Sequence, residues 1–329
     1  LKVVGIAGTK AGKVGKVVAG KFGTLTLKAD GSYSYVADRA EPLAVGRKVK
    51  DAFTYTLSDG KGGTDTATLT LTVTGVATGT AAGNHLLGTS RKDTLRGLGG
   101  ADTLDGGDGN DVLIGGAGGD RLLGGKGRDT ASYEDAKAGV TTNLANPKKN
   151  KGHAKGDTYS SIENLTGSAR ADSLTGDAGN NVVRGGAGND RLNGGDGDDR
   201  LEGGAGADTL TGAKGKDVLA GGGGADVFVF GAPGHSTSGA KGRDTILDFS
   251  RKDKDRIDVS GIDARSKTKK DEAFSFIGKD GFSGKAGELR YAVKSGDTFV
   301  YGDVDGDRKA EFTIELIGKI NLVKADFVL

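Results

Sequence analysis

The sequence predicts an all-β protein, and three stretches of it carry that prediction. A nine-residue unit, glycine-rich at its start and ending in Asp-x-Leu-x, repeats without interruption from residue 185 to residue 220. Residues 1–76 alternate between apolar and polar side chains, and residues 231–329 contain longer segments with strand character. Successive side chains of a strand point to opposite faces, and glycine permits the left-handed angles of tight turns. All three stretches therefore favour strands joined by turns.

The acidic position of the nine-residue unit keeps its phase in two runs, 77–134 and 162–230. In the first run it falls on Asn84, Asp93, Asp102, Asp111, Asp120 and Asp129. In the second run it falls on Asp172, Asn181, Asp190, Asp199, Asp208, Asp217 and Asp226. The interval between Asp129 and Asp172 is not a multiple of nine, so the sequence reads as two separate runs.

Each unit divides into a glycine-rich turn and a short strand with one inward apolar side chain. Two units then form one coil of a flattened parallel roll, with leucines stacked between two parallel sheets. Burying one leucine does not offset the conformational entropy of nine ordered residues, so the roll needs another source of stability. A flexible glycine-rich linker is the alternative, but it gives no reason for aspartate and leucine to stay in phase.

Bound calcium can supply the missing stability, because calcium binds six to eight oxygen ligands in tolerant geometry. Stacked coils bring together aspartates two units apart, such as Asp93 with Asp111 and Asp190 with Asp208. The predicted ligands are the aspartates and the turn glycines, whose carbonyl groups can point inward. They are Asp93, Asp102, Gly106, Gly107, Asp108, Gly109, Asp111, Gly115, Gly116, Gly118, Asp120, Asp129, Asp172, Gly185, Gly186, Gly188, Asp190, Gly194, Gly195, Asp196, Gly197, Asp199, Gly203, Gly204, Gly206, Asp208, Asp217 and Asp226.

Some turns depart from the pattern, and we expect weak or missing ions there. Asn84 and Asn181 stand in place of the aspartate. Residues 90–92, Ser-Arg-Lys, replace the glycine turn, and Lys214 and Lys216 crowd another one.

The nine-residue pattern resembles the RTX repeats of proteins exported by bacterial type I secretion. This resemblance implies a parallel β-roll in two runs, several calcium ions in the turns, and folding only outside the cell. It also implies a protein that is secreted, extracellular or associated with the cell surface, from a Gram-negative bacterium.

Composition excludes several classes of protein. The chain has no cysteine, which excludes disulfides and thiolate metal sites. No apolar stretch is long enough to span a membrane, and no signal peptide opens the sequence. There is also no methionine, so we expect the chain to begin inside a longer product. The net charge of +2 reflects either solubility or attraction to an anionic polymer such as an acidic polysaccharide. No nucleic-acid partner is expected.

Residues 1–76 predict a β-sandwich. Two hairpins are expected, one from strands at 24–27 and 33–36, the other from strands at 53–57 and 66–73. The phrases GKFGTLTLKADGSYSYVAD and DAFTYTLSDGKGGTDTATLTLTVTG resemble the VCBS, cadherin-like repeats of large bacterial surface proteins. The resemblance implies an Ig/cadherin-like sandwich, truncated because its first strands are missing. Its role is that of an adhesin stalk or of a spacer.

The segment 135–161 connects the two runs. It contains an expected strand at 140–144 and a basic loop at 147–155. The loop carries Lys148, Lys149, Lys151 and Lys155. It is either an ordinary solvated loop or a contact for an anionic polysaccharide or a cell surface.

Residues 231–329, together with the preceding ADVFVF, resemble the C-terminal domain of serralysin-type secreted proteases. The resemblance implies a β-rich capping and secretion domain that type I machinery engages through the C-terminus. Asp303, Asp305 and Asp307, with Glu311 nearby, form either one more calcium loop or a polar hairpin. The last four residues are an acid and three apolar side chains, expected either as a secretion signal or as a terminal strand. They are Asp326, Phe327, Val328 and Leu329.

No catalytic constellation is evident, so we do not expect this chain to be an enzyme. His85, His153 and His235 are followed by Leu, Ala and Ser, so none begins the His-Glu-x-x-His motif of a zinc peptidase, and no zinc site is visible. Two functions remain open. The chain is the calcium-binding C-terminal region of a bacterial surface adhesin or matrix protein, or it is the non-catalytic export tail of a secreted hydrolase or polysaccharide-modifying enzyme.

Overall fold

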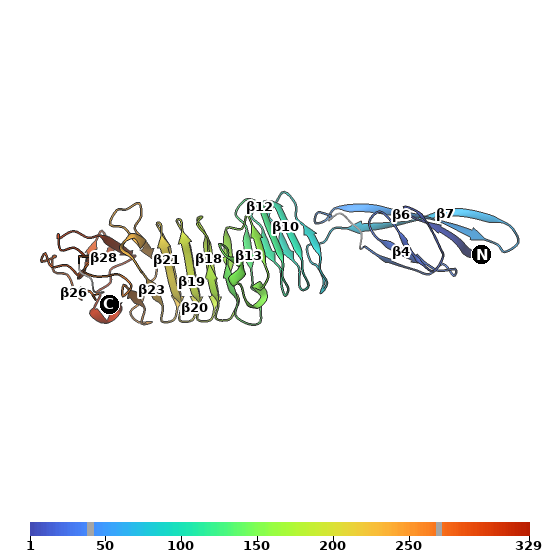
Figure 1. Ribbon diagram of the computed structural model, residues 1–329. Helices are drawn as coiled ribbons and strands as arrows, with labels where there is room; N and C mark the ends of the chain where they lie inside the picture. The colour runs from blue at the N-terminus through green and yellow to red at the C-terminus, as the bar shows by residue number, and fades with distance from the viewer. Residues whose placement is uncertain (38–42, 268–271) are drawn as a thin grey trace.

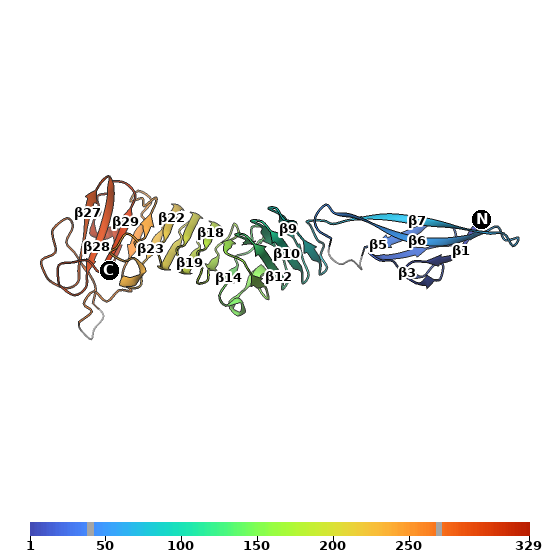
Figure 2. The same ribbon diagram turned by 90° about the horizontal axis from the view of Figure 1, so that it is seen from above.

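The computed structural model describes residues 1–37, 43–267 and 272–329, and it is an elongated all-β molecule. Figure 1 shows three parts in line: a sandwich at the N-terminal end, a parallel roll in the middle and an antiparallel cap at the other end. Figure 2 shows the same arrangement from above. No helix among the described residues has the length and apolar character needed to cross a bilayer.

The N-terminal part is a sandwich of two antiparallel sheets. One sheet contains β1 (Lys2–Ala7), β2 (Ala11–Gly12), β6 (Lys48–Ser58) and β7 (Thr64–Thr74). The other contains β3 (Val17–Ala19), β4 (Thr24–Leu27) and β5 (Tyr33–Val36). Both predicted hairpins are confirmed, since Leu27 pairs with Tyr33 and Phe53 pairs with Leu69.

A small apolar core and one buried carboxylate join the two sheets of the sandwich. The buried core side chains are Val3, Ile6, Val18, Leu25, Leu27 and Phe53. Asp51 on β6 accepts hydrogen bonds from the backbone N–H groups of Lys21 and Phe22, at 2.9 and 3.0 Å, and from Tyr35 Oη at 2.9 Å. These donors satisfy the charge that burial of Asp51 would otherwise leave unpaired.

The roll has short parallel strands on opposite sides. One face carries β8 (His85–Leu87), β10 (Thr103–Asp108), β12 (Arg121–Lys126) and β15 (Thr158–Ser160). The facing sheet carries β9 (Thr94–Arg96), β11 (Val112–Ile114), β13 (Thr130–Ser132), β16 (Asn164–Thr166), β18 (Val182–Ala187), β20 (Arg200–Ala205), β22 (Val218–Gly223) and β24 (Thr245–Ile246). Leu104 is aligned with Leu122 on the neighbouring strand of the same sheet, and Leu201 is aligned with Leu219 in the same way. Two units therefore make one coil, as predicted.

The two runs of the repeat belong to one continuous roll. The sheet that begins with β9 crosses the break between the runs, with Ala131 aligned to Leu165 and Leu165 to Val183. On the other side, the sheet with β8 ends at β15 and a new sheet begins at β14 (Thr141–Asn143). This sheet continues through β17 (Ser173–Thr175), β19 (Arg191–Asp196), β21 (Thr209–Lys214), β23 (Val227–Val229), β25 (Arg256–Asp258) and β30 (Phe327–Val328).

The inserted segment 135–161 lies at this change of sheet. Its strand β14 falls within the predicted 140–144, and its basic loop contains the 3-10 turns η1 (Pro147–Lys149) and η2 (Gly152–Ala154). The loop is tied back to β14, because Thr141 and Lys151 exchange backbone hydrogen bonds of 3.2 and 2.9 Å.

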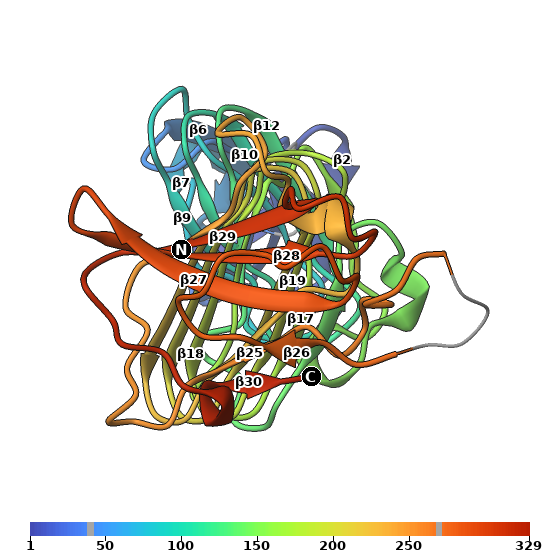
Figure 3. The same cartoon turned by 90° about the vertical axis from the view of Figure 1, so that its left-hand side faces the viewer.

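Parallel pairing continues beyond residue 230 into the C-terminal part. Ile246 of β24 aligns with Leu219 and with Leu316 of β29 (Phe312–Leu316), and Ile257 of β25 aligns with Phe327. An antiparallel hairpin of β27 (Glu288–Lys294) and β28 (Asp297–Asp303) extends the sheet from β29. Figure 3 shows β27, β28 and β29 at the C-terminal end of the roll, with β26 (Ser275–Phe276) below them. The short turns η3 (Pro233–His235) and η4 (Lys324–Asp326) complete this part.

Backbone hydrogen bonds join the sandwich to the first coil of the roll. Ala44 forms a parallel bridge with Leu87 of β8, and Thr78 forms one with Arg96 of β9. The Val45 N–H donates to the Leu87 carbonyl at 3.0 Å, and the Arg96 N–H donates to the Ala77 carbonyl at 2.8 Å. The segments on both sides of the sandwich's last hairpin therefore extend both sheets of the roll.

Candidate metal centre

The repeat aspartates form columns along the edges of the roll. In each column, one carboxylate oxygen accepts the backbone N–H of a residue one coil earlier, except at Asn181, whose Nδ2 donates to the Glu163 carbonyl at 2.8 Å. Asp111 Oδ1 accepts from Asp93 at 2.8 Å, and Asp208 Oδ1 accepts from Asp190 at 2.8 Å, so both predicted pairs of aspartates are stacked. The first column holds Asn84, Asp102, Asp120 and Asp157; the second Asp93, Asp111, Asp129, Glu163, Asn181, Asp199, Asp217 and Asp244; the third Asp172, Asp190, Asp208, Asp226 and Asp255.

The second carboxylate oxygen of ten column residues is buried without a hydrogen-bond partner among the described residues. We call these the open aspartates: Asp102, Asp111, Asp120, Asp129, Asp190, Asp199, Asp208, Asp217, Asp226 and Asp244. None of these side chains is more than 2% exposed. A buried carboxylate oxygen without a donor is unfavourable, unless a cation pairs with it.

A glycine five residues before each repeat aspartate makes room beside this oxygen. A Cβ on Gly106 would collide with Asp111 Oδ2 and would lie 2.7 Å from the carbonyl oxygen of Gly124 on the next coil. A Cβ on Gly185 would likewise collide with Asp190 Oδ2 and lie 2.6 Å from the Gly203 carbonyl oxygen. A carboxylate oxygen and a carbonyl oxygen thus converge beside Gly106 and beside Gly185, which is the oxygen-rich environment that calcium prefers.

The other two glycines of the turn serve the backbone. Gly107 and Gly109, four and two residues before Asp111, have φ of 93° and 139°. A Cβ on Gly109 would also approach the Arg91 backbone to 2.7 Å. Only a residue without a Cβ adopts such angles at no cost beside another coil. Leu98 and Ala213, which stand where Gly107 stands in its unit, also have positive φ, of 77° and 74°.

Burial makes the open aspartates weak acids in the absence of a cation. Desolvation raises the pKa of Asp190 and of Asp199 to about 7, and the neighbouring carboxylates Asp208 and Asp217 add to the rise. Desolvation raises the pKa of Asp244 to about 9. These groups are therefore poorly stabilised as anions by the protein alone, and a bound cation would supply the missing interaction.

At other column positions a donor of the protein fills the same place. At Asp157 and Asp255 it is the Tyr133 hydroxyl and the Ser250 N–H, both at 2.8 Å. At four repeat positions it is a residue four positions earlier. We call them the closed positions: Asn84, Asp93, Asp172 and Asn181. Asp93 Oδ2 accepts from the Thr89 N–H at 2.7 Å and from Thr89 Oγ1 at 2.8 Å. Asp172 Oδ2 accepts from the Ser168 N–H at 2.6 Å. The structure therefore places the predicted ligands Asp93 and Asp172 where protein donors already bind them.

The two asparagines are closed in the same way. Asn84 Oδ1 accepts from the Thr80 N–H at 2.5 Å, and Asn181 Oδ1 accepts from the Asp177 N–H at 2.8 Å. At all four closed positions the donor stands four residues earlier, where Gly107 stands in an open unit, and none of these donors has a positive φ. Thr, Ser or Asp at this position donates its N–H to the column side chain, whereas the left-handed Gly107 donates none to Asp111 Oδ2. The weak or missing ions expected at the asparagines and at turn 90–92 stay a prediction.

Two predicted ligands lie outside the columns. Asp108 and Asp196 precede the repeat aspartate by three residues, and their side chains are 54% and 58% exposed. Asp108 pairs with Lys126 at 3.2 Å, and Asp196 pairs with Lys214 at 3.4 Å, one coil later. Both point away from the oxygen-lined space and contribute exposed ion pairs, which stabilise little.

Sequence reasoning missed several column residues, because insertions make their distance from the preceding column residue 37, 27 and 29 residues, in place of the 18 residues of a regular coil. Asp157, Asp244 and Asp255 accept the backbone N–H groups of Asp120, Asp217 and Asp226 at 2.8, 2.9 and 3.0 Å. Each begins an acid-x-apolar triplet like that of the repeat: Asp-Thr-Tyr, Asp-Thr-Ile and Asp-Arg-Ile. Glu163, in Glu-Asn-Leu, does the same for Asp129 at 2.8 Å. That triplet was the signal available in the sequence.

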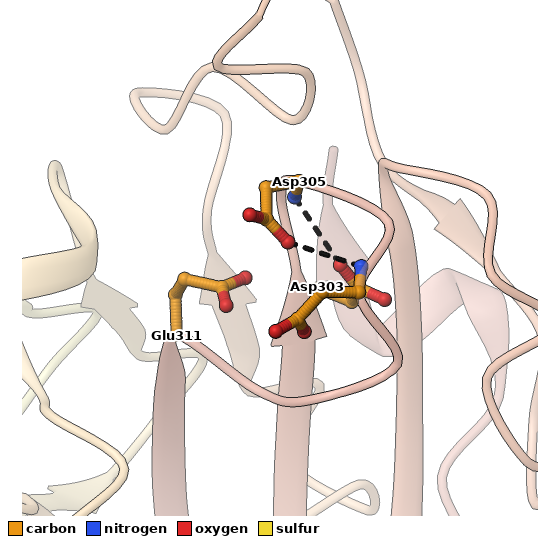
Figure 4. A group of neighbouring side chains, drawn as sticks. Asp303, Asp305 and Glu311 are labelled. Atoms are coloured by element: carbon orange, nitrogen blue, oxygen red, sulfur yellow. Dashed lines mark hydrogen bonds between the residues drawn. The ribbon is translucent and has the colours of Figure 1, made fainter.

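The acidic loop after β28 is a separate cluster. Figure 4 shows Asp303, Asp305 and Glu311 facing one another, and ligand oxygens of these and of Asp307 lie within 4.8 Å of one another. Asp303 accepts backbone N–H groups of its own loop, from Gly306 at 2.6 Å and from residue 308 at 3.0 Å. Lysines 267 and 309 lie at 3.3 and 3.1 Å from carboxylates of the loop. The loop thus has its own donors, and a calcium ion there stays a prediction.

The predicted secretion signal is part of the folded roll. Phe327 is buried in β30, and its carbonyl accepts from Arg256 Nη2 at 3.0 Å. Asp326 accepts from Arg251 Nε at 3.0 Å and from the Val323 N–H at 2.7 Å. Val328 aligns with Asp258, and Leu329 packs against the core of the roll.

Comparison with protein families gives the same division of the chain. Residues 4–75 match the bacterial cadherin-like domain. Residues 78–113 and 96–131 match the RTX calcium-binding nonapeptide repeat. Residues 162–329 match the C-terminal domain of the serralysin peptidases, family M10. The fold and the columns define a calcium-binding protein of the RTX class that is secreted. The chain belongs to the serralysin C-terminal family, whose match covers half of it.

The individual proteins that match this chain have low sequence identity to it. Among curated proteins no match is found. Two solution structures come from the Azotobacter vinelandii mannuronan C5-epimerase. Its AlgE6R2 subunit is 25% identical, with a TM-score of 0.36, covering 47% of this chain and 91% of that one. Its AlgE6R3 subunit is 25% identical, with a TM-score of 0.25, covering 48% and 78%. The crystal structure of the extracellular lipase LipA from Serratia marcescens is 18% identical, with a TM-score of 0.31, covering 76% and 40%.

Proposed function

We propose that this chain is the calcium-folded part of a bacterial surface adhesin or matrix protein, in which calcium joins a cadherin-like domain and a β-roll into one stiff rod. The observation that carries this proposal is the junction between the two. Backbone hydrogen bonds tie residues 45 and 77 to the first coil of the roll, on both of its sheets. Order in the roll is therefore transmitted to the sandwich.

The chain's own residues divide the work of holding the ions. The open aspartates offer Oδ2 to the cation, while their Oδ1 atoms keep successive coils in register through backbone N–H groups. The glycine five residues earlier leaves the space free, and the carbonyl of the next coil supplies a second oxygen. Calcium, when bound, supplies the positive charge that ten buried carboxylates lack. The coils that carry the open aspartates would then be unfolded at submicromolar calcium and folded at the millimolar concentrations outside cells, where extracellular calcium modules bind.

This dependence suits export through a narrow channel. Phe327 is buried in the folded roll, so a receptor could read residues 326–329 only in an unfolded chain. We propose that these residues belong to the signal that type I machinery recognises. Deleting residues 326–329 should abolish export from cells carrying such a system, whereas Ile317→Ala, at a side chain 45% exposed, should leave export intact. Normal export of the deletion variant would contradict the assignment.

We further propose that the chain itself is not an enzyme. The alternative, an export tail of a secreted hydrolase or polysaccharide-modifying enzyme, places the activity in another part of the same product. The cadherin-like domain at residues 4–75 favours the adhesin or matrix role, because such a domain adds length and stiffness rather than chemistry.

Small-angle X-ray scattering of the whole chain tests the rod. In millimolar calcium we expect the profile of a stiff elongated particle, and in chelator we expect a larger, flexible particle, because the roll expands when it unfolds. The same profile in both buffers would refute calcium as the stiffening agent. Export of the full product into calcium medium separates the two roles: an adhesin stays associated with cells or matrix, and an enzyme tail appears in the free medium.

A further inference from the structure

We infer that the roll consists of two calcium-dependent blocks separated by a belt that needs no calcium. The belt comprises residues 133–181. The first block contains the open aspartates Asp102, Asp111, Asp120 and Asp129, and the second contains Asp190, Asp199, Asp208, Asp217, Asp226 and Asp244. This inference rests on the proposed function, in which the open aspartates bind calcium.

In the first column, a chain of hydrogen bonds replaces the cation. Asp157 Oδ1 accepts the Asp120 N–H at 2.8 Å, as in any repeat, but Asp157 Oδ2 accepts from Tyr133 Oη at 2.8 Å. Tyr159 Oη lies 2.5 Å from Tyr133 Oη, and Asn150 Nδ2 donates to Tyr159 Oη at 2.8 Å. With Tyr133 donating to the carboxylate, Tyr159 donates to Tyr133. Every hydroxyl of the chain then has a donor and an acceptor role.

The other two columns are closed at the same level of the roll. In the third column, Asp172 Oδ1 accepts the Val140 N–H at 2.7 Å, and its Oδ2 accepts the Ser168 N–H at 2.6 Å. In the second column, Asn181 replaces the acid, and its Nδ2 donates to the Glu163 carbonyl at 2.8 Å. An amide provides its own donor, so no anionic oxygen is left without a partner there.

The belt also buries apolar side chains of its own. A repeat unit buries one apolar side chain in its strand. The inserted segment buries several apolar side chains besides its column residue. The buried apolar side chains within and beside the belt are Tyr133, Ala136, Val140, Ala154, Ile162, Leu165, Leu174 and Val183. Apolar burial and the pairing of Asp157, Asp172 and Asn181 together remove the deficit that makes a repeat unit depend on calcium.

A belt that stays folded would present an edge to each block. Strand β15 of the belt pairs with β12 of the first block, and β17 pairs with β19 of the second. Each block could then add coils to a preformed edge as calcium rises, without waiting for the other block. The inserted segment, which interrupts the repeat in the sequence, is in this view the folding template of the roll.

Hydrogen exchange of the full chain, read by mass spectrometry with and without chelator, tests the inference. In chelator at pH 8, amides of the belt strands β14, β15, β16 and β17 should exchange at least about tenfold more slowly than those of β10, β19 and β21. In millimolar calcium all of them should be protected. Tyr133→Phe removes the donor to Asp157, so belt exchange in chelator should accelerate about tenfold to a hundredfold. Tyr33→Phe, on the exposed side of the sandwich, is the matched control and should change nothing in the belt.

The possible failures are distinguishable. If belt and block strands exchange equally fast in chelator and both become protected in calcium, the inference that the belt needs no calcium is wrong and the proposed function stands. The same holds if Tyr133→Phe leaves belt exchange in chelator unchanged while calcium still protects the blocks. If calcium protects no strand of the roll, the proposed function fails and this inference fails with it.

Discussion

Asp199→Asn isolates the role of one open aspartate. The asparagine keeps an oxygen for the Asn181 N–H, which Asp199 Oδ1 now accepts at 2.8 Å. It removes the anionic Oδ2, which has no partner in the part of the chain that the structure describes. Two controls are matched to it. Asp93→Asn makes the same change at a closed position, and Asp196→Asn makes it at an exposed carboxylate three residues away.

The substitution should have two effects. Without calcium at pH 8, the variant should be more stable than the wild type by roughly 2–4 kcal/mol, because burial raises the pKa of Asp199 from 3.8 to about 7 and the asparagine carries no charge to bury. With calcium, the variant should lose about one linked ion, which contributes about 1.4 kcal/mol for each tenfold rise in calcium above the dissociation constant. The two stability curves should therefore cross within roughly one and a half to three decades of calcium.

Urea unfolding followed by circular dichroism gives the free energy of unfolding without calcium and its dependence on calcium concentration. An osmolyte such as sucrose is added at low calcium to keep the roll folded. The decisive number is the slope of the logarithm of the unfolding constant against the logarithm of calcium concentration. It should fall by about one ion in Asp199→Asn and remain unchanged in Asp93→Asn and Asp196→Asn. An unchanged slope in Asp199→Asn, or an equal fall in Asp93→Asn, would refute the distinction between open and closed positions.

Further predictions concern pH, the turn residues and the basic loop. In calcium-free buffer the roll should become less stable as pH rises from about 4 to 7. The folded-state pKa values of Asp190 and Asp199 are about 7 and exceed the unfolded value of 3.8, so the folded chain binds its protons more tightly. Thermal melts in which stability increases with pH over this range would contradict the prediction. Gly206→Ala, at φ 133° and against the backbone of Gly188 on the preceding coil, should cost at least about 2 kcal/mol, whereas Gly223→Ala, with open space around it, should cost under about 1 kcal/mol. Equal losses would show that the left-handed turn is not required. Ala213→Gly should stabilise the calcium-bound roll by about 0.5–1 kcal/mol, because alanine at φ 74° is strained; a lower melting temperature would refute it. Replacing Lys148, Lys149, Lys151 and Lys155 by serine should weaken binding to an acidic polysaccharide at low salt; equal binding of the variant would remove the loop as a contact.

The regular part of the roll could be predicted from the sequence because its information is local. A period of nine places one glycine turn and one inward leucine in every unit, and two units close a coil whatever lies elsewhere. Leu104 opposite Leu122 and Asp93 beside Asp111 follow from counting alone. The two sandwich hairpins were predictable for the same reason, since a turn and two alternating strands lie next to each other.

The irregular part could not be predicted, because its contacts join residues at irregular distances along the chain. Asp157 meets Asp120 and Tyr133, which lie 37 and 24 residues before it, and no repeat spacing relates them. Asp244 lies 27 residues after Asp217, because an inserted loop separates them. The closed positions were partly readable, since Thr89 and Ser168 replace the left-handed turn residue. What such a replacement does became clear only from the direction of its N–H group.

The most direct test of the central claim is a crystal structure of the calcium-loaded protein, with the ions located by their anomalous scattering. Calcium should lie at about 2.3–2.6 Å from Oδ2 of the open aspartates and from a glycine carbonyl of a neighbouring coil. No ion should touch Asp93 or Asp172, which already have protein donors. Ions at Asp93 and Asp172, or none beside Asp190, Asp199 and Asp208, would contradict the account.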